Sequence, residues 1–295
     1  MKLFHVLARA FMLTFLVSLA CAAAPAEKVI LSDAQLRLAD QALVSSYSRF
    51  PVDRRYNDTL NRVTFRLLRS SQEPRMGEVR LAVHYSNLGF NGLALYRLVV
   101  LDSLLLDGLK RYAQGAVLYG TVANEYTEKL AMYIGGLHRQ GRLGEVGKEF
   151  DAMNPYRIPP PPDFKPEMEP QAEAVFEEML AAWLCHEVSH IFLGHVEERY
   201  LSGQDMQHRL AMESIPPEVL QEMVRGYLDY SLGPLKEFEA DTLSLRLLTG
   251  SGYSREGIRR VLFLCKRIEE ASGYATRPLR THPRPVLRWR HLVEP

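Results

Sequence analysis

Residues 186 to 190 read His-Glu-Val-Ser-His, a pattern whose side chains can do metal chemistry. On an α-helix, residues four apart lie about 40° from eclipsed, so the imidazoles of His186 and His190 point to the same side. Two neutral imidazoles on one face are a natural pair of Zn²⁺ ligands. Glu187 is turned roughly 100° from His186, where it can take a proton from an attacking water instead of binding the metal. The spacing therefore indicates a zinc site with Glu187 as its general base.

The residues around this motif are mostly apolar. Ala181-Ala182-Trp183-Leu184 lies just before it, and Ile191-Phe192-Leu193 follows it. A helix that is apolar on most sides is buried. Buried histidine and glutamate side chains without partners would be costly, so partners are expected. This context disfavours the alternative, in which the motif is a solvated helix face that matches by chance.

His195 is the nearest further histidine, but its place in the sequence does not suit a third ligand. On a continuous helix, His195 would lie on the side opposite His186. The three-histidine metzincin pattern would need a glycine at position 193 and a histidine at 196, where this chain has Leu193 and Val196. His195 is therefore expected to support the site, as a structural residue or as a hydrogen-bond partner of a ligand.

A better third ligand lies downstream, in the run Glu-Phe-Glu-Ala-Asp that begins at Glu237. Glu237 and Asp241 are four residues apart and share a helix face. Glu237 could therefore bind the metal while Asp241 accepts a hydrogen bond from a liganding imidazole. Glu239 is turned about 200° from Glu237 and is the weaker candidate. Without the histidine pair upstream, these acidic residues would be read as an ordinary solvated helix face.

Together the two motifs resemble those of a zinc metallopeptidase family that includes the CaaX prenyl-protein protease and the HtpX membrane protease. Its soluble members include BepA-like periplasmic proteases and the mitochondrial OMA-type enzymes. The resemblance implies one Zn²⁺ per chain held by His186, His190 and Glu237, with Asp241 and His195 supporting the ligands. It also implies an endopeptidase that acts on unfolded or misassembled envelope proteins.

Two weaker motifs extend this resemblance, which covers most of residues 50 to 290. Thr281-His282-Pro283 and a later arginine, Arg288, match residues near the end of the family core. They imply that His282 or Arg288 stabilises the negative charge that develops during hydrolysis. Asn91-Gly92-Leu93-Ala94-Leu95 resembles the family's turn before an edge strand, which pairs with substrate backbone. That match implies that substrate is bound by Asn91, Leu93 and Leu95.

The sequence predicts an α+β, mostly helical fold, and the resemblance adds a zincin-like (gluzincin) domain with a small sheet beside the motif helix. Alternation from Val79 to Tyr85 is typical of a strand, and the apolar run Leu98 to Leu101 is either the next strand or helix. Helices are expected around Leu60–Leu68, from Leu104 to Phe150 with breaks near Gly135-Gly136 and Gly141, from Pro170 to about Leu201, and over Val219–Leu232, Leu235–Leu248 and Ile258–Ile268.

The N-terminus predicts export, with residues 1 to 26 as a signal peptide: a basic start, an uncharged apolar segment and Ala24-Pro25-Ala26. Lipidation at Cys21 and a retained anchor are the alternatives, so the protein is expected in the periplasm, with or without membrane attachment. Residues 27 to 295 are interpreted as one domain with an inserted segment at about 112 to 170. Its proline-rich part, Ile158 to Pro170, predicts a stiff surface connector, either a plain linker or a flap over the cleft.

Composition excludes some classes of function. The net charge of +1 argues against a nucleic-acid partner, and the basic residues near the C-terminus are read as a solvated face. Beyond Cys21, only Cys185 and Cys265 remain, which excludes a disulfide framework. Export would permit one bridge between them, but a buried free thiol is expected because Cys185 lies in a packed helix. The alternative to a peptidase is a zinc-bound chaperone or adaptor that binds unfolded proteins without cutting them, although such a binder would have no need of Glu187.

Overall fold

The structure is a computed structural model, and it describes residues 52–70, 74–85, 90–139, 158–198, 233–273 and 283–293. The chain divides into two units, Met1–Ser32 and Asp33–Pro295, and all described residues belong to the second. The predicted signal peptide, Cys21, His282 and the predicted helix at 219–232 lie outside the described residues.

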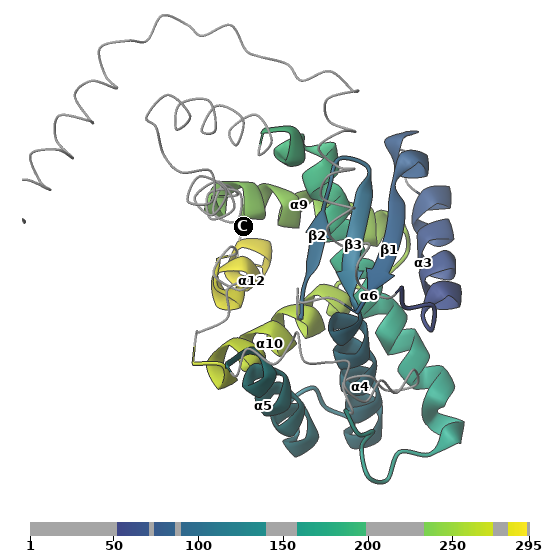
Figure 1. The fold of residues 1–295 in the computed structure, drawn as a ribbon, viewed down its shortest axis with the longest axis vertical. Helices are drawn as coiled ribbons and strands as arrows, with labels where there is room; N and C mark the ends of the chain where they lie inside the picture. Colours follow the sequence, from purple (N-terminus) through teal and green to yellow (C-terminus); the bar gives the residue numbers. More distant parts are fainter. Residues whose placement is uncertain are drawn as a thin grey trace, which may run out of the picture. The chain divides into compact units, whose positions relative to one another are not determined.

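The described part of the chain is α+β and mostly helical, with a small three-stranded sheet, as predicted (Figure 1). In chain order the elements are α3 (Asn57–Ser70), η1 (Pro74–Glu78), β1 (Arg80–His84), β2 (Gly92–Ala94), β3 (Leu98–Asp102), α4 (Ser103–Tyr119), α5 (Glu125–Arg139), η3 (Pro166–Met168), α6 (Glu169–Phe192), α9 (Pro234–Gly250), α10 (Glu256–Ala271) and α12 (Pro285–Val293).

The sheet has the strand order β1-β3-β2. β3 is the central strand, parallel to β1 and antiparallel to β2, and each of its residues is buried. This explains why its sequence is a continuous apolar run instead of an alternation. β2 pairs with β3 on one side, which makes it an edge strand of the described sheet, and Leu95 in the turn after it packs with Leu98 and Val100.

α4 follows β3 without a loop because Asp102 caps it. The Asp102 carboxylate accepts a hydrogen bond from the backbone N–H of Leu104 at 2.7 Å, a standard way to satisfy a helix start. The helix ends at Gly120, whose φ of 65° is the left-handed conformation that glycine adopts easily. The predicted helical stretch from Leu104 is therefore broken at residues 120–124.

The break predicted near Gly135-Gly136 is wrong, because both residues lie inside the continuous helix α5. Gly135 serves close packing instead. A Cβ at this position would come within 2.9 Å of the backbone nitrogen of Ser272, just after α10. Since real Cβ atoms do not approach so closely, only glycine lets α5 lie this near to the end of α10.

The predicted extent of the motif helix is also wrong. α6 ends at Phe192 and not near Leu201, and Gly194 follows with a φ of 74°. A new helical turn then begins at His195. Because the helix is interrupted there, His195 does not continue the helix of His186 and is not held on the opposite side of it.

α6 is the centre of the described fold, with contacts to α3, α4, α9, α10 and strand β2 (Figure 1). Its second half, from Met179 to Phe192, is buried on all sides, as the apolar sequence predicted. α10 packs closely on it, because a Cβ on Gly257 would lie 2.4 Å from the carbonyl oxygen of Glu178. The motif residues thus sit on a rigid element that its neighbours hold from several sides.

A buried polar cluster joins the start of α3 to α4. The guanidinium of Arg55 lies 2.8 Å from Asp53 and 2.9 Å from Asp107, and the hydroxyl of Tyr56 donates to Asp107. Burial raises the pKa of Asp107, and the opposing charge of Arg55 limits that rise. This cluster fixes α4, and with it the end of β3, by satisfying charges that would otherwise be costly to bury.

The two cysteines of the described chain, Cys185 and Cys265, are buried and free, as predicted. Burial raises the pKa of both thiols, to about 12 for Cys265, so both stay protonated.

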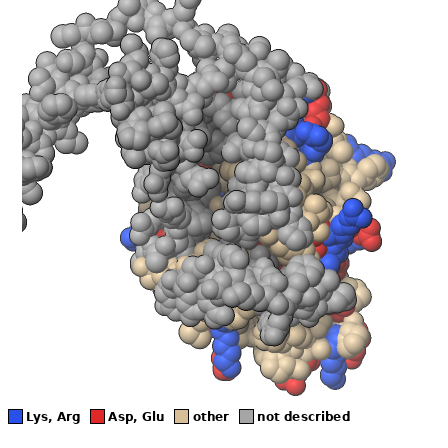
Figure 2. Space-filling view, viewed as in Figure 1, with Lys and Arg blue, Asp and Glu red and all other residues tan. Residues whose placement is uncertain are grey.

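Positive and negative side chains are interspersed on the described part of the face drawn in Figure 2. Ion pairs of the described residues include Arg62 with Glu173 and Glu177, each at 2.7 Å. Within the described residues, no helix combines the length and apolar character that crossing a membrane requires.

Candidate metal centre

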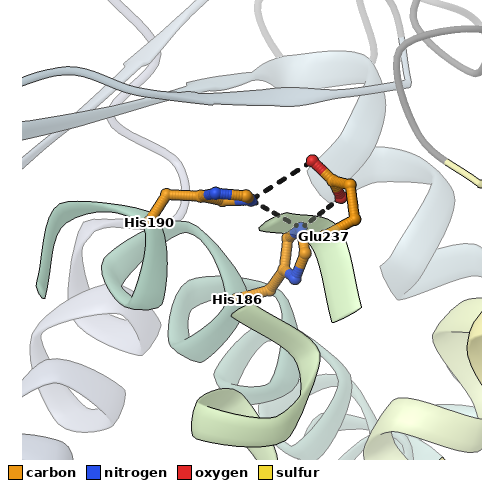
Figure 3. A group of neighbouring side chains, drawn as sticks. All are labelled: His186, His190 and Glu237. Carbon is orange, nitrogen blue, oxygen red and sulfur yellow. Dashed lines mark hydrogen bonds and ion pairs between the residues drawn. The ribbon is translucent and has the colours of Figure 1, made fainter. Parts of the chain in front are cut away.

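Three buried side chains from two helices converge on one point (Figure 3). His186 and His190 come from successive turns of α6, and Glu237 comes from the first turn of α9. Nε2 of His186 lies 3.2 Å from Nε2 of His190, and the Glu237 carboxylate lies 3.4 Å from the first and 3.5 Å from the second. These three residues form a triangle in which Oε2 of Glu237 faces His186 and Oε1 faces His190, and they could hold a metal ion.

The chemistry of this donor set fits a metal better than an ordinary core. Glu237 is fully buried, and His186 and His190 are 7% and 1% exposed. A buried carboxylate between two imidazoles needs a positive charge, either a proton or a metal ion. The sequence analysis grouped the same three residues. Helical spacing places His186 and His190 on one face of α6, and the contact between α6 and α9 brings Glu237 to them.

The second ring nitrogen of His186 faces an acidic residue, as predicted for Asp241. Nδ1 of His186 lies 3.1 Å from Asp241, four residues beyond Glu237 on α9. Arg288 of α12 holds that carboxylate with two hydrogen bonds, from Nε at 2.8 Å and Nη2 at 2.6 Å. Burial would raise the pKa of Asp241, but the Arg288 guanidinium holds it well below its usual range.

This environment also shifts the pKa of His186. Burial and the charge of Arg288 favour the neutral ring, but hydrogen bonds to Asp241 and Glu237 outweigh them and raise the pKa of His186 to about 9. The metal-free protein therefore holds a proton here near neutral pH. A metal ion that binds the site must displace it.

His190 has a different partner. Its Nδ1 lies 3.0 Å from Nδ1 of His195, and Nε2 of His195 lies 3.1 Å from the carboxylate of Glu239. His195 supports a ligand here and does not join the triangle. Its contact with His190 depends on the end of helix α6, where Gly194 adopts a left-handed conformation before His195. Burial lowers the pKa of His195, although Glu239 opposes that shift.

Glu187 lies beside the triangle without joining it. Its side chain is 4% exposed and lines a pocket next to the ligands. A Cβ on Gly92 would lie 3.4 Å from Glu187 Oε1 and only 2.7 Å from Nε1 of Trp183. Gly92 was predicted as part of a turn, but it begins strand β2. Glycine is needed there because the edge strand passes directly against the motif helix.

The pocket beside Glu187 is lined by both polar and apolar residues. The polar ones include Asn91, His186, Asp241 and Arg288. The apolar ones come largely from α6 and α10 and include Ala182, Trp183, Ile258, Val261 and Leu262. Such a mixture of apolar walls and a few converging polar groups is typical of ligand pockets.

The residues expected to bind substrate have different surroundings. Asn91 lines the pocket, and Leu93 is a half-buried residue of edge strand β2. Leu95 is fully buried in the sheet's core cluster, so its side chain is not available to a substrate. A contribution of Leu95 to substrate binding would therefore come from its backbone, and it stays a prediction.

The sequence analysis did not identify Trp183, or the α10 residues Ile258, Val261 and Leu262, as lining the pocket. Trp183 precedes His186, Glu187 and His190 by three, four and seven residues, which is the stripe of one helix face. That spacing could have revealed it. Nothing in the sequence pairs α10 with this face, because Ile258, Val261 and Leu262 are distant in the chain and form an ordinary amphipathic pattern.

Comparisons with known proteins add no further assignment. No protein-family model matches this chain, and no match was found among curated proteins or solved structures.

Proposed function

We propose that the protein is a zinc-dependent endopeptidase with a zincin-like (gluzincin) site, which hydrolyses peptide bonds of protein substrates. One observation carries this proposal. A carboxylate, Glu187, borders a pocket beside the triangle of His186, His190 and Glu237 and is not part of that triangle. A purely structural metal site needs closed coordination and has no use for such a group.

The dimensions of the triangle support zinc. Ligand atoms about 2.0 to 2.1 Å from a tetrahedral Zn²⁺ stand about 3.3 to 3.4 Å from one another. Here the two Nε2 atoms are 3.2 Å apart, and each lies 3.4 to 3.5 Å from one oxygen of the Glu237 carboxylate, Oε2 for His186 and Oε1 for His190. Two imidazoles and one carboxylate are a ligand set of catalytic zinc, in which the fourth position is left to water or substrate.

Zn²⁺ bound here would polarise the scissile carbonyl and make a water acidic enough to attack it. Glu187 would accept the proton of that water and return it to the leaving amine nitrogen. Asp241 would keep the His186 ring in place by accepting the proton of Nδ1. Arg288 donates two hydrogen bonds to Asp241. We therefore propose that Arg288 positions Asp241, and we prefer this role to stabilisation of the developing oxyanion.

Substrate would bind along β2 as an added strand, since β2 is an edge strand of the described sheet and passes close to Glu187 at Gly92. The apolar wall of Ile258, Val261 and Leu262 would receive an apolar side chain close to the cleaved bond. We extend the proposal to quality control of exported proteins, since the N-terminal sequence supports export and the motif resemblance supports unfolded or misassembled proteins as substrates.

The test is cleavage of unfolded casein by the purified protein, with and without a chelator and then with added zinc. Wild type should cut only when zinc is bound. Glu187→Gln should lose at least about 100-fold in rate while keeping one zinc per chain. Glu167→Gln in η3, an exposed carboxylate that does not line the pocket, is the matched control and should cut normally. Tight casein binding without cleavage by zinc-loaded wild type would favour the chaperone alternative.

A further inference from the structure

We propose that Glu239 is a positioning residue of the metal centre, which acts through His195 to fix the ring of His190. The proposal rests on the proposed function only in that His190 binds a metal ion. Glu239 touches neither the ligand triangle nor the pocket, so its role would be indirect. Three side chains carry the argument, in the order His190, His195, Glu239.

The hydrogen bonds determine where each proton lies. Nε2 of His190 faces the triangle, so it must be free of a proton when it binds a metal, and the proton is on Nδ1. That Nδ1 lies 3.0 Å from Nδ1 of His195, which must then accept. The proton of His195 is therefore on Nε2, 3.1 Å from the carboxylate of Glu239. A carboxylate can only accept here, so Glu239 selects the arrangement in which His190 can bind the metal.

The fold explains why this path reaches solvent. Glu239 is turned about 200° from Glu237 on α9, so the two carboxylates point away from each other. Glu237 is fully buried at the triangle, whereas the Glu239 side chain is 62% exposed. His195 lies between, with its side chain 3% exposed. A buried imidazole needs partners for both ring nitrogens, and His190 and Glu239 supply them.

A nearby carboxylate offers a matched comparison. Glu198, in the turn that begins at His195, forms an ion pair with Lys236 and is 51% exposed. It contributes negative charge near His195, as Glu239 does. Removing Glu198 therefore changes the local charge in a similar way while leaving the hydrogen bond from His195 to Glu239 in place.

The experiment measures zinc affinity by competition with a chelator for wild type, Glu239→Ala, Glu239→Gln and Glu198→Ala. Glu239→Ala should weaken zinc binding about 10-fold, the lower end for partners of metal ligands. Glu239→Gln keeps an acceptor oxygen and should stay within about 3-fold of wild type, as should Glu198→Ala. Equal losses in Glu239→Ala and Glu198→Ala would mean that charge alone matters, and would overturn the proposal.

A second measurement does not depend on catalysis. Nitrogen NMR of ¹⁵N-histidine protein separates the two neutral forms of a ring, and His195→Ala identifies the His195 signals among the nine histidines. In wild type, His195 should carry its proton on Nε2, and Glu239→Ala should lose that preference. An unchanged His195 form together with unchanged zinc affinity in Glu239→Ala would refute the role of Glu239. Zinc binding with the expected losses but no casein cleavage would refute the proposed function alone.

Discussion

The two histidines of the candidate metal centre, His186 and His190, have different kinds of neighbours. His186 faces Asp241, which is buried and paired with Arg288 from α12. His190 faces His195, whose other nitrogen meets Glu239 at the surface. The first arrangement ties three helices together through a largely buried ion pair, in which the Asp241 and Arg288 side chains are 3% and 13% exposed. The second is a chain of hydrogen bonds that ends in solvent, so it can fix a ring without holding the fold.

Substitutions in the two arrangements should therefore have different effects. Removing one partner of a buried ion pair leaves an uncompensated charge, which costs more free energy than the pair itself contributes. Removing the exposed end of a hydrogen-bond chain lets water take its place. We expect loss of stability on the His186 side and loss of metal affinity alone on the His190 side.

The largest effect is expected for Asp241→Asn. It leaves the Arg288 guanidinium without its counter-charge, so the free energy of unfolding should fall by about 3 to 5 kcal/mol. Urea unfolding of the metal-free protein measures this without any contribution from zinc. The double variant Asp241→Leu/Arg288→Met removes both charges and should recover most of the loss. If Asp241→Asn alone is as stable as wild type, the buried pair does not hold α12.

His138, which lies outside the candidate metal centre, offers a simpler case for comparison because burial is the cause of its pKa shift. It accepts the N–H of Phe90 at 3.3 Å, and burial lowers its pKa to about 4. Because this value lies below the unfolded value of about 6.5, the unfolded chain binds the proton more tightly. Stability should fall by up to about 3 kcal/mol as the pH drops from 7 to 4.

His138→Gln tests this, since glutamine can still accept the Phe90 N–H but does not titrate. Its free energy of unfolding should depend less steeply on pH than that of wild type over the same range. Parallel pH profiles for the two proteins would show that another group is responsible.

A smaller effect is expected for His195→Ala. At saturating zinc it should keep one zinc per chain, whereas His186→Ala and Glu237→Gln should lose the metal. Its affinity should fall about 10- to 100-fold, because His190 loses the acceptor that orients it. Metal analysis and chelator competition give the two quantities separately. Zinc loss in His195→Ala with retention in Glu237→Gln would reverse the ligand assignment.

The candidate site was predicted from the sequence where local geometry decides it. His186, His190, Glu237 and Asp241 follow from the spacing of helix faces, and one helix contact joins them. The position of His195 could not be predicted in this way, because it depends on the end of α6 and the left-handed conformation of Gly194. A glycine does not by itself predict a helix end, since Gly194 follows the end of α6 whereas Gly135 lies inside α5.

The fold shows the same limit. β1 and most of the helices were predicted because an alternation or a helical period is a property of a short segment, whereas the apolar run of β3 left strand and helix open and α12 was not predicted. Gly92 and Gly135 were misread as a turn and a break, since each is required by an element distant in the sequence. The pocket wall of α10 has no local signal at all, because its amphipathic pattern would suit any core.

The smallest effect is expected for the proline-rich segment, the hypothetical flap. Ile158 is buried and its carbonyl accepts a hydrogen bond from Arg111 of α4 at 3.0 Å, while the carbonyl of Pro159 accepts one from Tyr126 of α5 at 2.7 Å. The described residues of this segment are absent from the pocket lining. Replacing Pro159 to Pro162 with Gly and Ser should therefore leave cleavage of casein and of a short peptide within about 2-fold of wild type, as for surface changes elsewhere. A rate that rises for casein and not for the peptide would mean that the segment covers the cleft after all, because only the larger substrate needs a wide opening.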